Sequence, residues 1–468
     1  MFVNTEPLAP SSHTIEFVHL DDTIVAVATP PGRGGIGVVR LSGPDAVAIA
    51  MPMLRLQQSL EPGRALFGEL VEPGSSEQAR IDEVVVTYFA KPHSYTTDDV
   101  IEISAHGSPV ILAHIVELAL ARGARMAEPG EFTMRAFLNG RIDLTQAEAV
   151  PDLIDAQTLY QAKVAAQQLE GALSKRLQPV KQKLVELIAV LEAGIDFAED
   201  DVSVLPAQKI LEGVAAVRSP LEELLHSFGY GKVVREGITL AIVGRPNVGK
   251  SSLFNRLVER ERAIVTATPG TTRDLVTETV SIEGIPVQLV DTAGLRRALD
   301  EAESIGIQKS MEALADADLV LVVMDSSHPH TNEDEQLLAQ VEGRAAIVVQ
   351  NKADLTPSQA FASNGNQTVR TSALTGEGIA ELRAAILQEA TGAGSSEPGF
   401  LTNARHQALV RESLEMLVKA VGAVAQKIPH EMLLLDLYAA LRPLDAITGA
   451  TTNDDILNLI FSRFCIGK

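Results

Sequence analysis

Several features that mark particular classes of protein are missing from this sequence. One cysteine, Cys465, stands among 468 residues, which excludes an intrachain disulfide framework and a metal site built from clustered cysteines. No apolar run is long enough to cross a lipid bilayer, and the first twenty residues lack the basic and apolar regions of a secretory signal. We therefore expect a soluble, cytoplasmic protein that begins with a disordered extension over residues 1–21.

Basic residues are also scarce relative to acidic ones. The chain has 39 lysines and arginines against 61 aspartates and glutamates, which gives a net charge of −22. Neutralising phosphates requires a basic surface, so this balance argues against broad, non-specific affinity for nucleic acids. Any contact with RNA would have to use a local basic patch or the surface of a partner. The length and the 46% hydrophobic content allow several buried cores, in about two to four domains.

What the sequence does contain is a phosphate-binding loop. Gly244–Ser251 fits the pattern G-x-x-x-x-G-K-[ST]. An apolar, β-branched run at 238–243 precedes the loop, and helical spacing follows it at 252–257, which is the strand–loop–helix context that the motif requires. Backbone N–H groups of such a loop and the N-terminus of the following helix favour the binding of phosphate. We expect Lys250 to reach the β- and γ-phosphates and the hydroxyl of Ser251 to bind Mg²⁺.

Three further motifs follow in the order that a GTPase requires. Asp291 opens Asp-Thr-Ala-Gly after an apolar strand, where its carboxylate can hold Mg²⁺ through water and the amide of Gly294 can sense the γ-phosphate. Asn351–Asp354 follows the next apolar strand. The carboxylate of Asp354 can accept two hydrogen bonds from guanine, a donor pair that adenine lacks, so it selects GTP over ATP. Ser372–Leu374 then offers a backbone amide to guanine O6.

Residues 22–139 predict an α+β domain. Apolar, β-branched runs at 23–28, 36–41, 82–89 and 99–104 indicate strands, and residues 109–121 indicate a helix. The glycines at 32, 34 and 37 match a dinucleotide-binding fingerprint. That fingerprint needs a helix directly after the glycines, and this sequence predicts a strand, so we reject a Rossmann domain.

The rest of the chain predicts helices on both sides of the nucleotide-binding segment. Residues 140–233 form the first helical part, residues 234–392 the GTPase domain, and residues 393–468 the second helical part after a linker rich in small residues. Insertions succeed where chain ends lie close together. The predicted fold is therefore an α/β P-loop GTPase domain inserted in an α-helical domain, preceded by the α+β domain.

Four internal motifs and the C-terminal residues are distinctive, namely Thr29–Gly35, Glu128–Thr133, Arg135–Asn139, Asp143–Ala149 and Phe464–Lys468. In these motifs, the chain from Asp22 onward resembles the tRNA modification GTPases of the MnmE family, also called TrmE. A P-loop GTPase core together with this C-terminal sequence is a narrow signature.

The resemblance implies a function for each domain. The N-terminal domain would bind 5-formyltetrahydrofolate and form the homodimer. With the flavoprotein MnmG, in a heterotetramer, the protein would add a carboxymethylaminomethyl or aminomethyl group at C5 of the wobble uridine of certain tRNAs. The implied folate-binding residues are Arg40, Glu102, Arg141 and Lys468. A carboxylate suits the pterin N–H groups, and Arg or Lys suits the glutamyl tail.

The resemblance also implies how GTP is hydrolysed. Leu295 stands where many GTPases place a water-orienting glutamine, so catalytic help must come from elsewhere. A K⁺ ion would take the place of an arginine finger when two nucleotide domains pair. Glu303 would orient the attacking water, and Lys250 and Glu303 are the implied catalytic residues.

The implied metal ligands are Ser251 and Thr272 for Mg²⁺, and Asn247, Thr266, Thr268 and Thr271 for K⁺. The residues expected at the nucleotide are Asn247, Val248, Gly249, Lys250, Ser251, Ser252, Thr266, Ala267, Thr268, Pro269, Gly270, Thr271, Thr272, Asp291, Thr292, Ala293, Gly294, Asn351, Lys352, Ala353, Asp354, Ser372, Ala373 and Leu374.

Two other functions stay open. The chain could be a ribosome-assembly type of GTPase switch that needs no folate, although the N-terminal domain and the C-terminal motif argue against this. It could also be a folate-dependent one-carbon enzyme with a regulatory GTPase attached. Binding of 5-formyltetrahydrofolate would separate the first alternative from the others, and analysis of tRNA nucleosides would separate the second.

Overall fold

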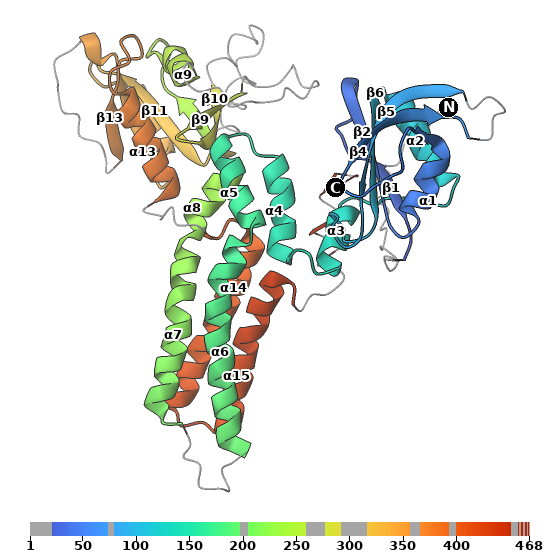
Figure 1. The fold of residues 1–468 in the computed structure, drawn as a ribbon. Coiled ribbons are helices and arrows are strands. Elements are labelled where there is room, and N and C mark those ends of the chain that lie inside the picture. Colours follow the sequence, from blue (N-terminus) through green and yellow to red (C-terminus); the bar gives the residue numbers. More distant parts are fainter. Residues whose placement is uncertain are drawn as a thin grey trace, which may run out of the picture. The chain divides into compact units, whose positions relative to one another are not determined.

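The computed structural model describes residues 21–73, 79–196, 205–258, 277–291, 316–355, 366–392 and 399–450, and residues 457, 460, 461, 464, 465 and 467. Contacts divide the chain into two units, of which the first comprises Met1–Glu148 with Thr451–Lys468 and the second Ala149–Ala450. Figure 1 shows the ribbon of both units. Among the helices in these ranges, none has the length and apolar composition needed to cross a membrane.

A seven-stranded sheet forms the centre of the first unit, in the order β3-β4-β5-β6-β2-β1-β7. Its strands are β1 (Ile24–Val27), β2 (Gly34–Ser42), β3 (Leu54–Leu56), β4 (Ala65–Val71), β5 (Arg80–Phe89), β6 (Val100–Gly107) and β7 (Arg125–Met126). Only β1 and β7 pair in parallel among the described strands of this sheet. The four strands predicted from the sequence are confirmed. Because β2 contains the glycines at 34 and 37, the rejection of a Rossmann loop is confirmed as well.

Helices pack on both faces of this sheet near β1 and β2. They are α1 (Ala46–Ala50), the 3-10 helix η1 (Met51–Met53), α2 (Pro109–Leu120) and α3 (Glu131–Leu138), followed by α4 (Leu144–Ile154). Leu41, Ile103 and Ile115 are fully buried in the core that α1 and α2 cover. On the opposite face, Phe132 of α3 packs against Ile24 of β1. The alternation of strand residues thus sends neighbouring side chains into two different cores.

A partly buried ionic network anchors α3. Glu131 and Arg135 are fully buried and pair at 2.8 Å, Arg125 reaches Glu131 at 2.6 Å, and Asp22 accepts from Arg135 at 2.5 Å. Burial by itself would raise the pKa of Asp22, but the hydrogen bonds and charges of Arg125 and Arg135 outweigh it and lower the pKa. Since α3 leads directly to Arg141, the network fixes the segment that carries a predicted folate ligand.

Replacing Asp22 by asparagine is expected to weaken the anchoring of α3 by about 1.5–3 kcal/mol at neutral pH, because a hydrogen bond between charged groups is lost. The folded-state pKa is lowered, so this contribution is present above the unfolded pKa near 4 and is lost as pH falls through the folded value. Hydrogen exchange of the α3 amides measures the opening free energy. The difference in opening free energy between variant and wild type should become smaller below about pH 4. An equal difference at pH 3 and pH 7 would contradict the assignment.

Helices from two distant parts of the chain form one bundle in the second unit. The helices outside the nucleotide-binding segment are α5 (Leu159–Leu169), α6 (Ala172–Asp196), α7 (Ala207–His226), α8 (Phe228–Glu236), α14 (Ala404–Ala425) and α15 (His430–Thr448). Figure 1 shows α6 and α7 in green beside α14 and α15 in red. Leu184, Leu417 and Leu437 are fully buried in their common core. The predicted insertion of the nucleotide-binding segment into one helical domain is thereby confirmed.

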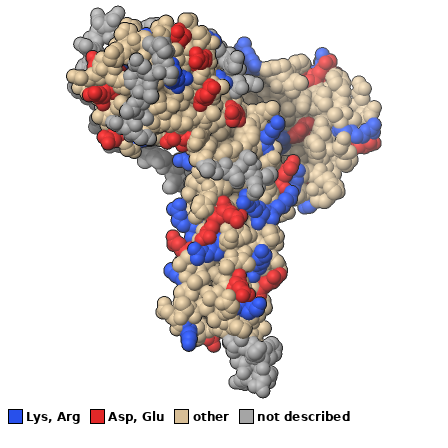
Figure 2. Space-filling model, turned by 90° about the vertical axis from the view of Figure 1, so that its left-hand side faces the viewer, with Lys and Arg blue, Asp and Glu red and all other residues tan. Residues whose placement is uncertain are grey.

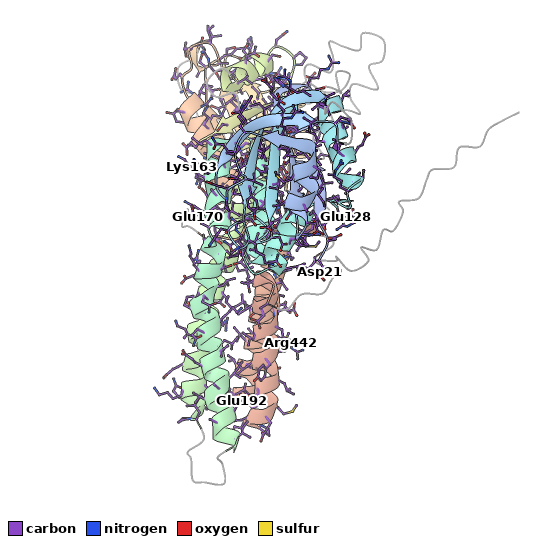
Figure 3. The ribbon with its side chains drawn as sticks, turned by 45° about the vertical axis from the view of Figure 1, so that its right-hand side comes forward. Asp21, Glu128, Lys163, Glu170, Glu192 and Arg442 are labelled. Carbon is purple, nitrogen blue, oxygen red and sulfur yellow. The ribbon has the colours of Figure 1, made fainter. Side chains whose placement is uncertain are left out.

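Polar contacts join α6 to α15 across this insertion. Lys181 pairs with Asp445 at 2.7 Å, and the hydroxyl of Tyr438 donates to Glu192 at 2.6 Å. Figure 3 shows the two helices side by side, with Glu192 labelled on α6 and Arg442 on α15. The two contacts are more than two turns apart along α6, so together they favour one register between helices that are distant in sequence.

The nucleotide-binding segment folds around a six-stranded sheet, in the order β13-β12-β11-β8-β10-β9. Its strands are β8 (Ile238–Val243), β9 (Thr277–Ile282), β10 (Ile285–Asp291), β11 (Leu319–Asp325), β12 (Ala346–Asn351) and β13 (Gln367–Arg370). Its helices are α9 (Lys250–Val258), α12 (Asn332–Gln340), the 3-10 helix η3 (Ala353–Leu355) and α13 (Ile379–Thr391). All described pairs are parallel except β9 with β10. In such sheets, ligands bind beyond the carboxyl ends of the strands, where the predicted motifs lie.

Candidate functional site

The phosphate-binding loop connects β8 to α9, as predicted. β8 ends at Val243 and α9 begins at Lys250, so the loop leads directly into a helix N-terminus. The ammonium group of Lys250 donates to the carbonyl oxygen of Gly244 at 2.9 Å and to that of Arg245 at 2.6 Å. Phosphate oxygens carry charge and are stronger acceptors than these carbonyls. Lys250 therefore reaches across the loop that would hold the phosphates, and can exchange these acceptors for a nucleotide.

Asn247 and Ser251 supply oxygen ligands beside this loop. Asn247 is exposed and has a φ of +61°, a conformation that asparagine adopts more readily than most residues. Ser251 is half-buried in the first turn of α9. An amide oxygen and a hydroxyl are hard ligands of the kind that Mg²⁺ and K⁺ prefer. The described part of the predicted metal site therefore fits cations of this class.

Asn351 ties three of the predicted motifs together. Its Nδ2 donates to the carbonyl oxygen of Val248 in the phosphate loop at 2.9 Å, and its Oδ1 accepts from the amide of Ala373 at 3.0 Å and from Thr371 at 3.4 Å. Asn351, Thr371 and Ala373 are all buried. One side chain thus holds the phosphate loop against the segment predicted to meet guanine O6, although the two are more than 100 residues apart.

An ion pair orders the side of the site predicted to face the base. Lys352 contacts Asp325, the last residue of β11, at 2.6 Å. Burial alone would raise the pKa of Asp325, but hydrogen bonds from Lys352 and Ser327 outweigh it and lower the pKa to about 2. Asp325 is thus ionised at neutral pH and holds the Lys352 ammonium beside Asn351. Asp354, the residue predicted to accept from guanine, lies two residues further on and is exposed in η3.

Two residues at this site were missed by the sequence analysis. Asp325 stands at the end of an apolar strand, as the predicted motifs do, and this position in the sequence could have identified it. Arg256 of α9 donates to the carbonyl oxygen of Ala373 at 3.1 Å and to that of Leu374 at 2.6 Å. No local pattern marks Arg256, because its partners lie 117 and 118 residues away in the chain.

Part of the predicted site lies outside the described residues. This applies to the residues at 266–272, 292–294, 303 and 468, which include Glu303, predicted to orient the attacking water, and four of the implied metal ligands. For Asp291 the backbone is described but the side chain is not. Its backbone ends β10 and pairs with Ile242 of β8, which brings the start of the Asp-Thr-Ala-Gly motif beside the strand that leads to the phosphate loop.

A second candidate site is a cavity of about 620 Å³ in the first unit. Its lining residues are Phe89, Pro92, His93, Ser94, Tyr95, Thr97, Val100, Glu102, Asn139, Gly140 and Arg141. Ligand-binding cavities commonly measure about 300–1,000 Å³ and combine apolar walls with a few polar groups. This cavity has both, and its size suits a molecule with several rings.

Two of the four predicted folate ligands line this cavity, and a third pairs with one of them. Glu102 and Arg141 line it, and Arg40 pairs with Glu102 at 2.7 Å. The guanidinium of Arg141 lies 5.0 Å from the ring centre of Tyr95 and donates to the Tyr95 carbonyl oxygen at 2.7 Å. Arg40 lies 5.5 Å from the ring of Phe132. The cavity therefore offers a carboxylate, Glu102, and a guanidinium, Arg141, beside the aromatic side chains of Phe89 and Tyr95.

Comparison with known proteins decides the family. The profile of the GTP-binding protein TrmE N-terminus matches residues 23–141, and the profile of the MnmE helical domain matches residues 144–465. The tRNA modification GTPase MnmE of Koribacter versatilis (strain Ellin345) is 68% identical over 457 residues, covering 96% of this chain and 100% of that protein. The chain belongs to the MnmE family of tRNA modification GTPases.

More distant members of the MnmE family also match over nearly the whole chain. The tRNA modification GTPases MnmE of Aquifex aeolicus (strain VF5) and Bacillus subtilis (strain 168) are 44% and 42% identical, and each match covers 96% of this chain and 100% of the relative. The family therefore accounts for both units. The resemblance seen in the motifs is confirmed, and the chain is a GTPase.

Proposed function

We propose that this MnmE-family GTPase acts in the cytoplasm with the flavoprotein MnmG, as a heterotetramer built on its own homodimer. Together they would add a carboxymethylaminomethyl or aminomethyl group at C5 of the wobble uridine, position 34, of certain tRNAs. The one-carbon unit would come from 5-formyltetrahydrofolate, and GTP hydrolysis would drive the motions that the reaction needs. One chain combines a guanine nucleotide site with a cavity suited to a pterin, and this observation carries the proposal.

The chain's own residues would hold GTP at three places. Lys250 would contact the phosphates, Asn351 keeps the loops in register, and Asp354 would accept from guanine. Ser251, with Thr272 in the GTP state, would ligate a Mg²⁺ ion that offsets the charge of the β- and γ-phosphates. These assignments rest on the contacts of Lys250 and Asn351 described above.

Hydrolysis would depend on K⁺ and on pairing of two nucleotide domains. Asn247, with Thr266, Thr268 and Thr271, would coordinate the ion, whose charge would stabilise the transition state as an arginine finger does. Glu303 would orient the water, because Leu295 cannot. The exposed position of Asn247 on the phosphate loop supports this part of the proposal.

The cavity of the first unit would bind the folate. Glu102 would accept hydrogen bonds from the amine and the ring N–H of the pterin, while Arg40, Arg141 and Lys468 would face the carboxylates of the glutamyl tail. Aromatic walls such as Tyr95 suit a flat ring system. The charges and the size of the cavity support this assignment.

An open face of the first sheet supports a homodimer. Phe67 of β4 and Val85 of β5 are direct neighbours, and they are 54% and 40% exposed. Ser104 pairs with Val85 in the next strand, and Glu102 lies two residues along on the same face. A contiguous exposed apolar surface commonly marks an interface. A second copy covering this row would lie beside the proposed folate cavity.

Contact with tRNA would rely largely on the partner. In the face shown in Figure 2, basic and acidic side chains are interspersed over the described surface, and the whole chain carries a charge of −22. Strong binding to phosphates needs a basic surface. A MnmG partner that supplies this surface is consistent with the charge of this chain.

Glu102→Gln is expected to weaken binding of 5-formyltetrahydrofolate by about 10- to 100-fold, since a hydrogen bond to a charged group contributes about 1.5–3 kcal/mol. Isothermal calorimetry with the full chain measures this. Glu83→Gln is the matched control, because Glu83 is an exposed carboxylate on β5 that pairs with Arg80. Absence of binding heat for the wild type would rule out the folate site, and equal affinity of the Glu102 variant would rule out the role of this residue.

A further inference from the structure

We propose that Arg256 is a positioning residue for guanine recognition: from α9 it fixes the peptide between Ala373 and Leu374, so that the amide of Leu374 points at guanine O6. The inference deepens the proposed GTP site and rests on it, because the segment Ser372–Leu374 is predicted to meet that oxygen. Arg256 would not touch the nucleotide. It would act through the backbone that the base contacts.

The amide of Leu374 is the donor in this segment that a base can engage without breaking a contact within the protein. The amide of Ser372 donates to the carbonyl oxygen of Glu377 at 2.9 Å, and that of Ala373 donates to Oδ1 of Asn351 at 3.0 Å. Among the residues that the structure describes, none accepts from the amide of Leu374. Leu374 is 78% exposed, whereas Ser372 and Ala373 are buried. The segment therefore meets solvent, and a ligand, at Leu374.

Arg256 sets the direction of that amide through the planar geometry of the peptide bond. Its Nε donates to the carbonyl oxygen of Ala373 at 3.1 Å. This oxygen and the N–H of Leu374 belong to one peptide group, which is trans, so the two point in opposite directions. Holding the oxygen toward α9 therefore directs the N–H away from α9, on the side where a base can accept from it.

The same guanidinium also holds the next carbonyl group. Its Nη2 donates to the oxygen of Leu374 at 2.6 Å. Nε and Nη2 lie on one edge of the planar guanidinium, so Arg256 binds two successive peptide groups at once. A lysine carries its donors on a single ammonium group and lacks this fork. The fork fixes the peptides on both sides of Leu374, which a single hydrogen bond would leave able to rotate.

The position of Arg256 is set by the helix that also carries the phosphate-binding lysine. α9 begins at Lys250, and Leu253 and Leu257 are fully buried in the core of the nucleotide-binding segment. The carbonyl oxygen of Leu257 accepts from Arg383 of α13 at 3.0 Å. Lys250 and Arg256 are about 9 Å apart along the axis of this helix, at about 1.5 Å per residue. One rigid helix therefore links the phosphate end of the site to the segment that would meet the base.

Loss of the fork is expected to affect one edge of guanine and to spare the other. The amide of Leu374 would meet O6, whereas Asp354 would meet the N1–H and the exocyclic amine. Arg256→Gln keeps a polar side chain, but this side chain is shorter and has one amide group in place of the fork. We therefore expect a weaker contact with O6 and an unchanged contact with Asp354.

Two analogues of GTP separate these edges of the base. In 6-thioguanosine triphosphate, sulfur replaces O6 as a weaker acceptor, and the N1–H and the amine are kept. Inosine triphosphate keeps O6 and lacks the amine. Competition against a fluorescent GTP analogue, with the full chain and Mg²⁺, gives each affinity. Wild type should bind GTP about 3- to 10-fold more tightly than the sulfur analogue, because one neutral hydrogen bond changes affinity by about this factor.

Arg256→Gln should bind GTP about 3- to 10-fold more weakly than wild type and should bind the sulfur analogue as wild type does, so its preference for oxygen is lost. Its preference for GTP over inosine triphosphate should equal that of wild type. Arg344→Gln is the matched control, because Arg344 is an exposed arginine of the same domain, and it should keep both preferences. Arg256→Lys keeps the charge without the fork. It should also lose the preference for oxygen, and it replaces the glutamine variant if that variant does not fold.

A full preference for GTP over the sulfur analogue in Arg256→Gln would overturn the positioning role. Equal loss of both preferences would overturn it as well, because it would show that the whole base site has loosened. A wild type that prefers GTP over inosine triphosphate but not over the sulfur analogue would rule out the contact of Leu374 with O6. If the wild type has neither preference, the proposed guanine site itself fails, so the two failures are distinguishable.

Discussion

Asparagine in place of Asp354 is expected to lower the affinity for GTP by about 10²- to 10³-fold and to favour xanthosine triphosphate. The carboxylate accepts from the N1–H and the exocyclic amine of guanine, and the amide of asparagine turns one of these contacts into a clash of two donors. Xanthine carries an oxygen in place of that amine, so the asparagine amide can donate to it. A binding site that pairs its hydrogen-bonding groups with those of one ligand rejects a mismatched ligand by several orders of magnitude, because the mismatched complex leaves polar groups unpaired.

Competition between GTP and xanthosine triphosphate for the purified protein measures this switch. Asp316→Asn is the control, because Asp316 is an exposed carboxylate of the same domain. It removes the same charge without touching the base, so it should leave the preference for GTP intact. An Asp354 variant that binds GTP as tightly as wild type would show that the guanine-binding residue lies elsewhere.

Exchange of Na⁺ for K⁺ is expected to raise GTP turnover by at least about tenfold, up to the range of an arginine finger, about 10³- to 10⁵-fold. Asn247 should carry much of this response, because its side-chain oxygen lies on the exposed part of the phosphate loop. Its φ of +61° adds strain when the residue becomes alanine. Asn247→Gly is therefore the sharper variant, since it tolerates this backbone and lacks only the oxygen.

Steady-state turnover in matched chloride salts gives the comparison. Both Asn247→Ala and Asn247→Gly should lose the difference between K⁺ and Na⁺, whereas Asn255→Ala, an exposed asparagine on α9, should keep it. A wild-type rate that is the same in both salts would refute the potassium site. If only the alanine variant lost the difference between K⁺ and Na⁺, backbone strain rather than the missing oxygen would be the cause.

The sequence predicted those parts of the fold and the site that depend on local patterns. β8, β10 and β12 each end in a polar motif, and parallel strands bring such ends to one edge of a sheet. The residue pattern alone was therefore enough to place the phosphate loop, the start of the Asp-Thr-Ala-Gly motif at Asp291 and the Asn-Lys-Ala-Asp motif together. Helical spacing on both sides of this segment was likewise enough to predict the insertion.

Contacts between distant residues could not be read in this way. Asn351 meets Val248 and Arg256 meets Ala373 across more than 100 residues, and the partner in each case is a backbone group that leaves no mark in the sequence. The backbone of Gly467 lies against that of Val27 across an even longer stretch of sequence. A resemblance could name Arg40 and Glu102 as ligands, but only the structure shows that they hold each other.

Mass spectrometry of tRNA nucleosides tests the central claim most directly. A strain that lacks this gene would be complemented with the wild type, with Lys250→Ala or with Glu102→Gln, and the modified wobble uridines would be measured. We predict that the wild type restores the carboxymethylaminomethyl or aminomethyl group at uridine 34, and that neither variant does. An unchanged nucleoside profile after deletion, or full restoration by the Lys250 variant, would contradict the proposal that GTP hydrolysis by this chain drives the modification.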